Sequence, residues 1–477
     1  MNMIPNPNNL PLPRAPRRLL AESRCLVGAL ALLVMSGYVS AAGFDDESHV
    51  VIKARKVIVG DGEEYSPGTV VLTDGKVALV GTDIEYPSDA DVIEAPTETV
   101  MPGLVLPRTR YGLRDYSRRG INGDQKVEDE VYLDLIDFDD LLELGFTTVG
   151  YVPDGDGITG IASVYRTAGP DDARIIADAG FIDAALRWDQ SGKGKATLRG
   201  ALKKAKEEIE KVEKAREEWE EKQKKKAEEE KKKEKEKADQ PKPEEKPKSA
   251  AGDNGEPEKK PDKKEGDGGA EKKEEKFEPP PIDPKLQPLV DLLQKKENVR
   301  IMVRVQRASD LLHLDDVLGE SEDYEHIEPV YYLANALWRF TDYHYVVQKL
   351  GEREARVVVT PGVSTLPYTT NRYNLIDALS DAGCHVAALP ERDAPFAYRQ
   401  LRMRLAESVR EGLSRESAIK AMTGHAAAAV GAADRVGSLE KDRDGDLAFF
   451  DGDPLDPRSK VTRIMVRGEI VWKAEDE

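Results

Sequence analysis

Two arginines stand two residues apart at the end of an apolar run in the segment ETVMPGLVLPRTRYG, residues 98–112. The run has the composition of a buried strand, so Arg108 and Arg110 fall where that strand reaches the edge of its sheet. A guanidinium has five N–H donors and no lone pair, and it stays protonated at accessible pH. The pair therefore favours binding of carboxylate or phosphate groups and is unsuited to binding a divalent cation.

Residues for other kinds of catalysis are few. The chain has six histidines, a small supply for a dinuclear metal site, and we expect structural or surface roles for them: His49, His313, His326, His344, His385 and His425. Cys25 and Cys384 cannot form a disulfide framework. No nucleophile elbow or Walker loop is present, and GDGITG lacks the spacing of a dinucleotide-binding loop. Loop aspartates at 124, 154 and 156 are typical of turns.

Length and charge limit the class of protein. With 477 residues the chain can form one large domain and an appended small one. The formal net charge is −19 and the isoelectric point is about 5.1, which argues against nucleic-acid binding. The sequence leaves open whether the chain forms a homo-oligomer.

The N-terminus has the order of a secretory signal peptide. PRAPRRLLAESR, residues 13–24, supplies positive charge, and CLVGALALLVMSGYVSAAG, residues 25–43, supplies an apolar core followed by small residues. We predict cleavage after Ala41 or Ala42, a signal peptide of residues 1–42, and export to the periplasm or the extracellular space without stable membrane insertion. The alternative is an uncleaved N-terminal helix that anchors the chain.

The pattern of apolar and polar residues after the N-terminal segment predicts an α/β protein. Short β-branched runs interrupted by Asp-Gly and Pro-Gly pairs occupy residues 48–100 and return in residues 433–477, so we expect one small β-sandwich built from both chain ends. Between them, apolar runs alternate with helical stretches, which is the pattern of β/α units around a parallel sheet. This middle part, residues 101–432, is predicted to be the main domain.

A charged insertion interrupts the main domain at residues 200–281. Residues 200–237 are almost all Glu, Lys and Ala, and Leu202, Ile209, Val212 and Trp219 recur among them at helical spacing. This pattern predicts a helix whose composition is similar to that of a coiled coil. Beyond Trp219 the helix would be stabilised by Glu–Lys pairs. Residues 239–281 have no periodicity and too little apolar surface to fold, so we expect disorder. The lysines of this segment alternate with glutamates, so we do not expect them to bind nucleic acid.

Several segments resemble the amidohydrolase superfamily, in particular imidazolonepropionase-like members. VMPGLVLPRTR is similar to the first barrel strand, which leads to a His-x-His pair in the family, and VGYVPDGDGITGIASVYRTAG to its Gly-rich segment. VRIMVRVQRASDLL resembles the fifth strand, and residues 357–395 resemble the seventh and eighth. The closing segment, residues 412–457, follows the family pattern most closely. The resemblance implies a distorted (β/α)8 TIM barrel plus the composite β-sandwich.

The family's metal ligands are not carried over by this resemblance. The His-x-His pair falls on Arg108 and Arg110, and the fifth-strand histidine falls on Arg304, with Gln306 at a second position nearby. The sixth-strand histidine would lie within residues 338–342, where none exists. The eighth-strand aspartate falls near Glu391. The chain is thus similar to a degenerate family member that lacks the metal-binding histidines, and no metal or other cofactor is predicted.

The barrel places these positions around one cavity. We predict that Arg108, Arg110, Arg304, Gln306 and Glu391 form a ligand site, in which Glu391, helped by Asp393 or Asp342, pairs with the arginines. The favoured function is an exported, metal-free pseudoenzyme that binds a small anionic ligand or a partner. One alternative is a hydrolase of carbon–nitrogen bonds with a rebuilt site that uses Glu391, Asp393 and the loop aspartates, and a divalent metal such as zinc is expected only in that case. Another is a scaffold that acts through the charged arm.

Overall fold

The computed structural model describes residues 48–114, 118–186, 192–238, 276–296, 299–337 and 342–475. The predicted signal peptide lies outside these residues, and so does most of the segment predicted to be disordered. Among the residues that the model describes, no helix is long and apolar enough to cross a membrane.

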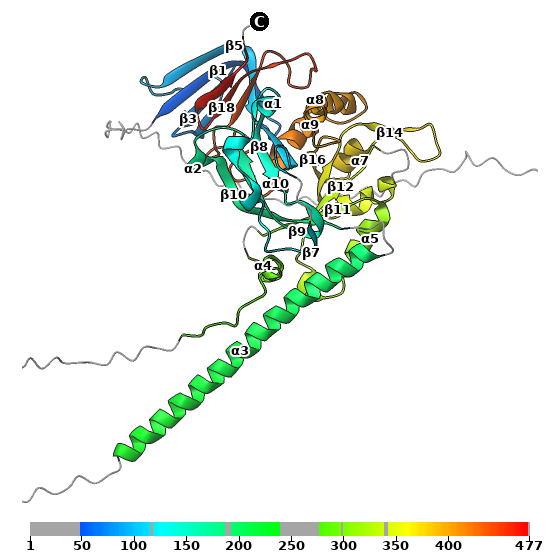
Figure 1. Cartoon of the computed structure of the whole chain (residues 1–477). Coiled ribbons are helices and arrows are strands. Elements are labelled where there is room, and N and C mark those ends of the chain that lie inside the picture. Colours follow the sequence, from blue (N-terminus) through cyan, green and yellow to red (C-terminus); the bar gives the residue numbers. More distant parts are fainter. Residues whose placement is uncertain are drawn as a thin grey trace, which may run out of the picture. The chain divides into compact units, whose positions relative to one another are not determined.

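Strands from both chain ends form one mixed sheet, in the order β19-β18-β17-β5-β1-β3-β4 with β2 beside β1. Figure 1 shows the blue strands of the first part next to the red β18 of the last part. The two ends meet where β17 runs antiparallel to β5, with Phe449 opposite Val100. The prediction that both ends build one β domain is confirmed, and its strands join in a single continuous sheet. Its strands are β1 (His49–Ile58), β2 (Glu64–Tyr65), β3 (Gly68–Thr73), β4 (Lys76–Gly81), β5 (Asp91–Pro102), β17 (Leu447–Phe450), β18 (Val461–Val466) and β19 (Glu469–Lys473).

A second sheet is a nearly closed barrel with the strand order β16-β13-β12-β11-β10-β9-β8-β6 and with β7 beside β9. Neighbouring strands are parallel, except that β9 is antiparallel to β8 and to β10. The predicted α/β class and distorted barrel are confirmed. The strands are β6 (Leu104–Thr109), β7 (Arg118–Ile121), β8 (Phe146–Tyr151), β9 (Gly155–Arg166), β10 (Ile175–Ala185), β11 (Ile301–Val305), β12 (Val330–Leu333), β13 (Arg356–Val359) and β16 (His385–Ala388).

Helices pack against the barrel strands: α9 packs on β16, and α10 packs on β16, β13 and β6. Ser414 caps α9, because its hydroxyl accepts a hydrogen bond from the backbone N–H of Ser417 at 2.9 Å. The hairpin β14 (Val363–Thr365)–β15 (Arg372–Asn374) stands apart from both sheets. The shorter helices are α1 (Asp139–Leu142), α2 (Asp171–Arg174), α4 (Gln287–Leu293), α5 (Ala308–Leu318), α6 (Val347–Gly351), α7 (Leu375–Asp381), α8 (Pro395–Arg410), α9 (Arg415–Met422) and α10 (Gly424–Ala429).

The predicted charged helix is present as α3 (Lys193–Ala238), which begins seven residues earlier than the sequence suggested (Figure 1). Leu198 extends the apolar stripe towards the N-terminus, and it is buried together with Leu202. This first part of α3 contacts α4 and α5. Further along, the ring of Trp219 lies 5.8 Å from that of Phe277, so the chain returns alongside the helix after the insertion.

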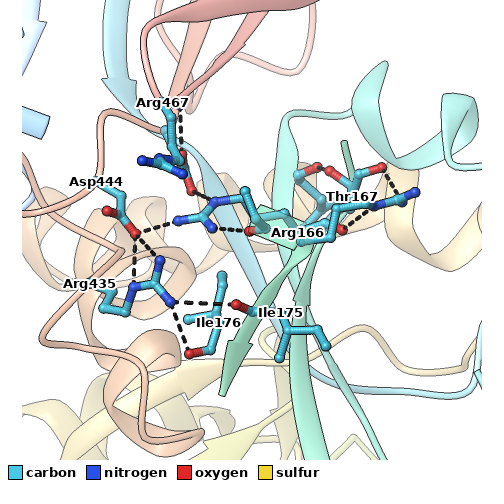
Figure 2. Close-up of polar contacts among 11 residues, drawn as sticks. Arg166, Thr167, Ile175, Ile176, Arg435, Asp444 and Arg467 are labelled. Carbon is cyan, nitrogen blue, oxygen red and sulfur yellow. Dashed lines mark hydrogen bonds and ion pairs between the residues drawn. The ribbon is translucent and has the colours of Figure 1, made fainter. Parts of the chain in front are cut away.

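A buried polar cluster fastens the barrel strand β9 to the loops of the β domain, as Figure 2 shows. The Arg166 side chain is fully buried, and its guanidinium donates to Asp446 at 2.8 Å and forms an ion pair with Asp444. Arg435 also pairs with Asp444, at 2.9 Å, and donates to the Ile176 carbonyl at 3.1 Å. Such a cluster is stable only when every charge has a partner, because desolvation of an unpaired ion is costly.

Candidate ligand-binding site in the barrel

The register of the parallel strands directs three polar side chains to one face of the barrel sheet. Residues paired directly across neighbouring strands share a face. Asp183 on β10 pairs with Met302 on β11, and Arg304, two residues beyond Met302, pairs with Tyr332 on β12. Because these positions lie towards the carboxyl ends of their strands, they belong to the end of a barrel where ligands bind.

The Arg108 side chain on β6 forms a bidentate ion pair with the carboxylate of Asp183 on β10. Its Nε lies 3.2 Å from Oδ1 and its Nη2 lies 3.3 Å from Oδ2, and the two side chains are 20% and 2% exposed. The Thr159 hydroxyl donates to the same carboxylate at 2.8 Å. Burial lowers the pKa of Arg108, but the charge and hydrogen bond of Asp183, together with Tyr332 and Asp393, raise it by more, so the pKa lies above its ordinary value.

The ring of Tyr332 brings two guanidinium groups together. The Cζ atom of Arg108 lies 5.5 Å from the ring centroid, and the Cζ atom of Arg304 lies 5.8 Å from it. Both distances are in the range of a cation–π contact. The structure therefore brings Arg108 and Arg304 to the same place, as the sequence predicted.

Arg110 is held by other partners, just past the end of β6. Its guanidinium donates to the Val152 carbonyl at 2.7 Å and pairs with Glu130 at 3.1 Å. Glu130 in turn accepts from Gln125 at 2.6 Å, so both of its oxygens are engaged. Glu130 also lines a cavity of about 570 Å³ together with Tyr132, Leu135 and Arg114. The walls of this cavity are mainly apolar, and the cavity lies beside this end of β6.

The prediction that Glu391 pairs with the barrel arginines is wrong. Glu391 was predicted to pair with them, but its side chain is 43% exposed and forms its ion pair with Arg404 on α8, at 2.6 Å. The reason is its distance in sequence from β16, which ends at Ala388. Glu391 therefore falls in the surface loop before α8, and the buried carboxylate beside Arg108 is Asp183.

The other predicted polar residues have structural contacts. Asp393 accepts hydrogen bonds from the Thr109 hydroxyl at 2.6 Å, the backbone N–H of Arg110 at 2.5 Å, and the Tyr398 hydroxyl. It thereby fastens the end of β6 to α8. Asp342 accepts from the N–H of Ala308 at 2.8 Å. Gln306 follows β11 directly, and its backbone N–H donates to Asp310.

Sequence reasoning missed Asp183 and Tyr332. Asp183 is a lone carboxylate in the otherwise apolar run GFIDAAL, a signal that marks a buried, paired acid. Tyr332 was missed because the predicted end of the sixth strand, at residues 338–342, is too late in the sequence: β12 ends at Leu333. Of residues 338–342, only Asp342 is among the described residues.

The donor set does not fit a zinc-type metal. The positions that correspond to the family's ligands hold Arg108, Arg110, Arg304 and Gln306, and a guanidinium has no lone pair for a cation. Within the described ranges, no group of three His, Cys, Asp or Glu side chains lies close enough to hold a metal ion. The carboxylate that is present, Asp183, is already bound to a cation of the protein itself.

One histidine has a distinctive environment away from this site. His425 on α10 is largely buried, with its ring 5.1 Å from that of His385 and Nδ1 3.3 Å from the Val386 carbonyl. Burial, with a smaller contribution from the charge of His385, lowers the pKa of His425 from 6.5 to about 4.

We expect this histidine to give a measurable pH dependence. Between pH 6.5 and about 4 the unfolded chain binds a proton at His425 that the folded chain does not bind. The free energy of unfolding must therefore fall as the pH decreases through this window. Urea denaturation of the wild type and of His425→Gln across the window measures the effect: the variant should lose less stability on acidification. His49→Gln is the control, and equal slopes for wild type and His425→Gln would contradict the expectation.

Comparison with known proteins agrees with this fold. Residues 364–471 match the family model described as the amidohydrolase family. Among solved structures, an amidohydrolase from Thermotoga maritima has a TM-score of 0.63 and 19% sequence identity, covering 89% of this chain and 100% of that one. A molinate hydrolase has a TM-score of 0.46 and 13% identity, covering 90% of this chain and 95% of its own. A search of curated proteins found no significant match.

The family match covers the C-terminal part of the chain, and the likeness to the Thermotoga maritima structure extends over most of its length. The likeness to the Thermotoga maritima protein concerns the fold, since so low an identity does not carry an activity from one chain to another.

Proposed function

We propose that this chain is an exported protein that uses an amidohydrolase barrel to bind an anionic ligand, without metal-dependent hydrolysis. The observation that carries the proposal is the Arg108–Asp183 pair beside Tyr332 and Arg304, at the end of the barrel where members of this fold class bind their ligands. The proposal of export rests on the composition of residues 13–43.

Arg108 has the geometry to bind an oxyanion while it keeps its internal partner. Asp183 occupies Nε and Nη2, whereas Nη1 has no hydrogen-bond partner among the described residues. One fifth of the Arg108 side chain is exposed, so the remaining edge can be reached from solvent. A planar carboxylate or a phosphate matches the fork of a guanidinium, and the cation–π contacts with Tyr332 fix its orientation.

A rebuilt hydrolytic site around Glu391 and Asp393 fits the contacts less well. A general base must have a lone pair directed at water or substrate. Asp393 accepts three hydrogen bonds from the protein, and Glu391 is engaged by Arg404 in the loop before α8. These contacts stabilise the closure between β6 and α8 and leave both carboxylates poorly placed for catalysis.

Two measurements on the purified mature protein test the proposal. Elemental analysis should find zinc, manganese and iron well below one equivalent per chain. Calorimetric titration with succinate and with inorganic phosphate should show binding that Arg108→Gln and Arg304→Gln each weaken by about tenfold, which corresponds to about 1.4 kcal/mol. Arg458→Gln is the matched control, because Arg458 is exposed and pairs with Asp456 at the surface.

Arg304→Gln is included because it leaves the Arg108–Asp183 pair in place. Stoichiometric metal together with hydrolysis of an amide would overturn the proposal. So would binding of both anions that is unchanged in the two variants.

A further inference from the structure

Cationic side chains gather at the opposite end of the barrel from Arg108. A cavity of about 390 Å³ opens where β11, β12 and β13 begin. Arg300 precedes β11, Arg356 is the first residue of β13, and Val330, the first residue of β12, lies in the same wall. Because these strands are parallel, their amino ends come together on the side away from the ligand site described above.

The charges of this cavity are only partly compensated. Its wall holds Lys295, Lys296, Arg300, His326 and Arg356, with Glu328 as its carboxylate. Lys296 pairs at 2.6 Å with Asp291, which lines the adjoining cavity, and Arg356 pairs with Glu328 at 3.3 Å through a largely exposed carboxylate.

Arg300 is the under-compensated group. Its guanidinium is fixed by donation to the Ala428 carbonyl at 2.9 Å, and among the described residues it has no carboxylate within ion-pair distance. Burial lowers the pKa of Arg300, and the charge of Arg356 lowers it further, while Asp434 has the opposite effect. In a chain with a formal net charge of −19, a locally cationic cavity attracts anions.

Arg300 and Val299 also line a second cavity of about 420 Å³ with mainly apolar walls. Its apolar lining includes Ile161, Phe181, Ile182, Ile282 and Pro288. Besides Arg300, its charged lining is Lys126, Asp124 and Asp291, and Asp291 is paired with Lys296. Arg300 therefore stands between a cationic space and an apolar one. Pockets that bind small organic molecules have this combination of apolar walls and a few fixed polar groups.

We propose that the two cavities form one site for an amphiphilic organic anion. The carboxylate or phosphate head lies between Arg300 and Arg356, where two guanidinium groups can grip it, and the apolar part lies against Ile282 and Pro288. The site is independent of the barrel-mouth arginines, and it uses residues that surround the amino ends of the strands.

Calorimetric titration of the full mature chain with octanoate, octyl phosphate and 1-octanol tests this site. We expect both anions to bind, the tighter of the two identifying the head group, and octanol to bind at least about tenfold more weakly. Arg300→Gln and Arg356→Gln should each weaken binding of the anions by about tenfold, and Arg300→Lys by less because it keeps the charge. Ile282→Asp, which places a carboxylate in the apolar wall, should weaken it by a similar factor.

Arg356→Gln keeps the test decisive even if Arg300→Gln reduces stability through the lost contact with Ala428. Arg458→Gln should bind like the wild type, since Arg458 is a surface residue of the β domain loops. Equal affinity for octanol and octanoate, or anion binding unchanged by both Arg300→Gln and Arg356→Gln, would overturn the proposal. Binding that Arg108→Gln abolishes and Arg300→Gln leaves intact would also overturn it, because the anion would then occupy the other end of the barrel.

Discussion

Replacement of Arg166 by methionine is expected to lower the free energy of unfolding by about 3–5 kcal/mol, because it leaves the buried carboxylate of Asp446 without its cation and removes one of the two cations beside Asp444. Asp444 and Asp446 both bind the guanidinium of Arg166, which is 0% exposed. In this variant Arg435 still pairs with Asp444. The Asp446 carboxylate keeps its hydrogen bond from the backbone N–H of Arg467 but has lost its cation. Urea denaturation followed by circular dichroism measures the change.

Two further variants define what the Arg166 result means. Arg458→Met removes one partner of a surface pair whose arginine is 90% exposed, and it should leave the free energy of unfolding nearly unchanged, because solvent screens such a pair. Adding Asp446→Asn to Arg166→Met removes one of the stranded charges and should recover part of the loss. A loss below about 1 kcal/mol for Arg166→Met would show that water reaches the cluster and that it does not hold the two sheets together.

Replacement of Asp183 by alanine is expected to cost about 3–5 kcal/mol as well, since it strands the buried side of Arg108 and removes the acceptor of Thr159. The double variant Arg108→Met/Asp183→Ala should be less destabilised than the sum of the single variants, because neither charge remains. The difference, measured as a double-mutant cycle in urea, gives the coupling between the two side chains.

Chemical rescue separates the structural role of Asp183 from general damage to the barrel. Acetate can supply the carboxylate that Asp183→Ala lacks, so it should raise the Tm of this variant more than that of the wild type. Sodium chloride at equal ionic strength is the control for screening. An equal response of both proteins to acetate would mean that the space left by Asp183 does not admit an anion, and it would weaken the case for ligand binding beside Arg108.

The sequence by itself determined the elements of the fold. β-branched runs with Asp-Gly turns at both ends predicted the β domain, and the alternation of apolar and helical segments between them predicted β/α units around a parallel sheet, because these patterns are set by local geometry with periods of two and 3.6 residues. The closure of that sheet into a barrel was implied by the resemblance to amidohydrolases. The helix within the charged insertion followed from Leu202 and Trp219 at helical spacing. The chemistry of Arg108 and Arg304 was equally local, since a guanidinium has no lone pair for a metal wherever it lies.

Only the tertiary structure decided which charges meet. Arg108 and Asp183 are 75 residues apart and Arg166 and Asp446 are 280 apart, and their pairing depends on the register of strands and the course of loops. Glu391 was an attractive partner in sequence, but the short strand β16 ends at Ala388 and places it in a surface loop near Arg404. The position of Tyr332 beside Arg108 likewise depends on where β12 ends, which is at Leu333. A shift of a few residues at a strand end moves a side chain between the barrel interior and solvent, and local pattern does not fix strand ends with that accuracy.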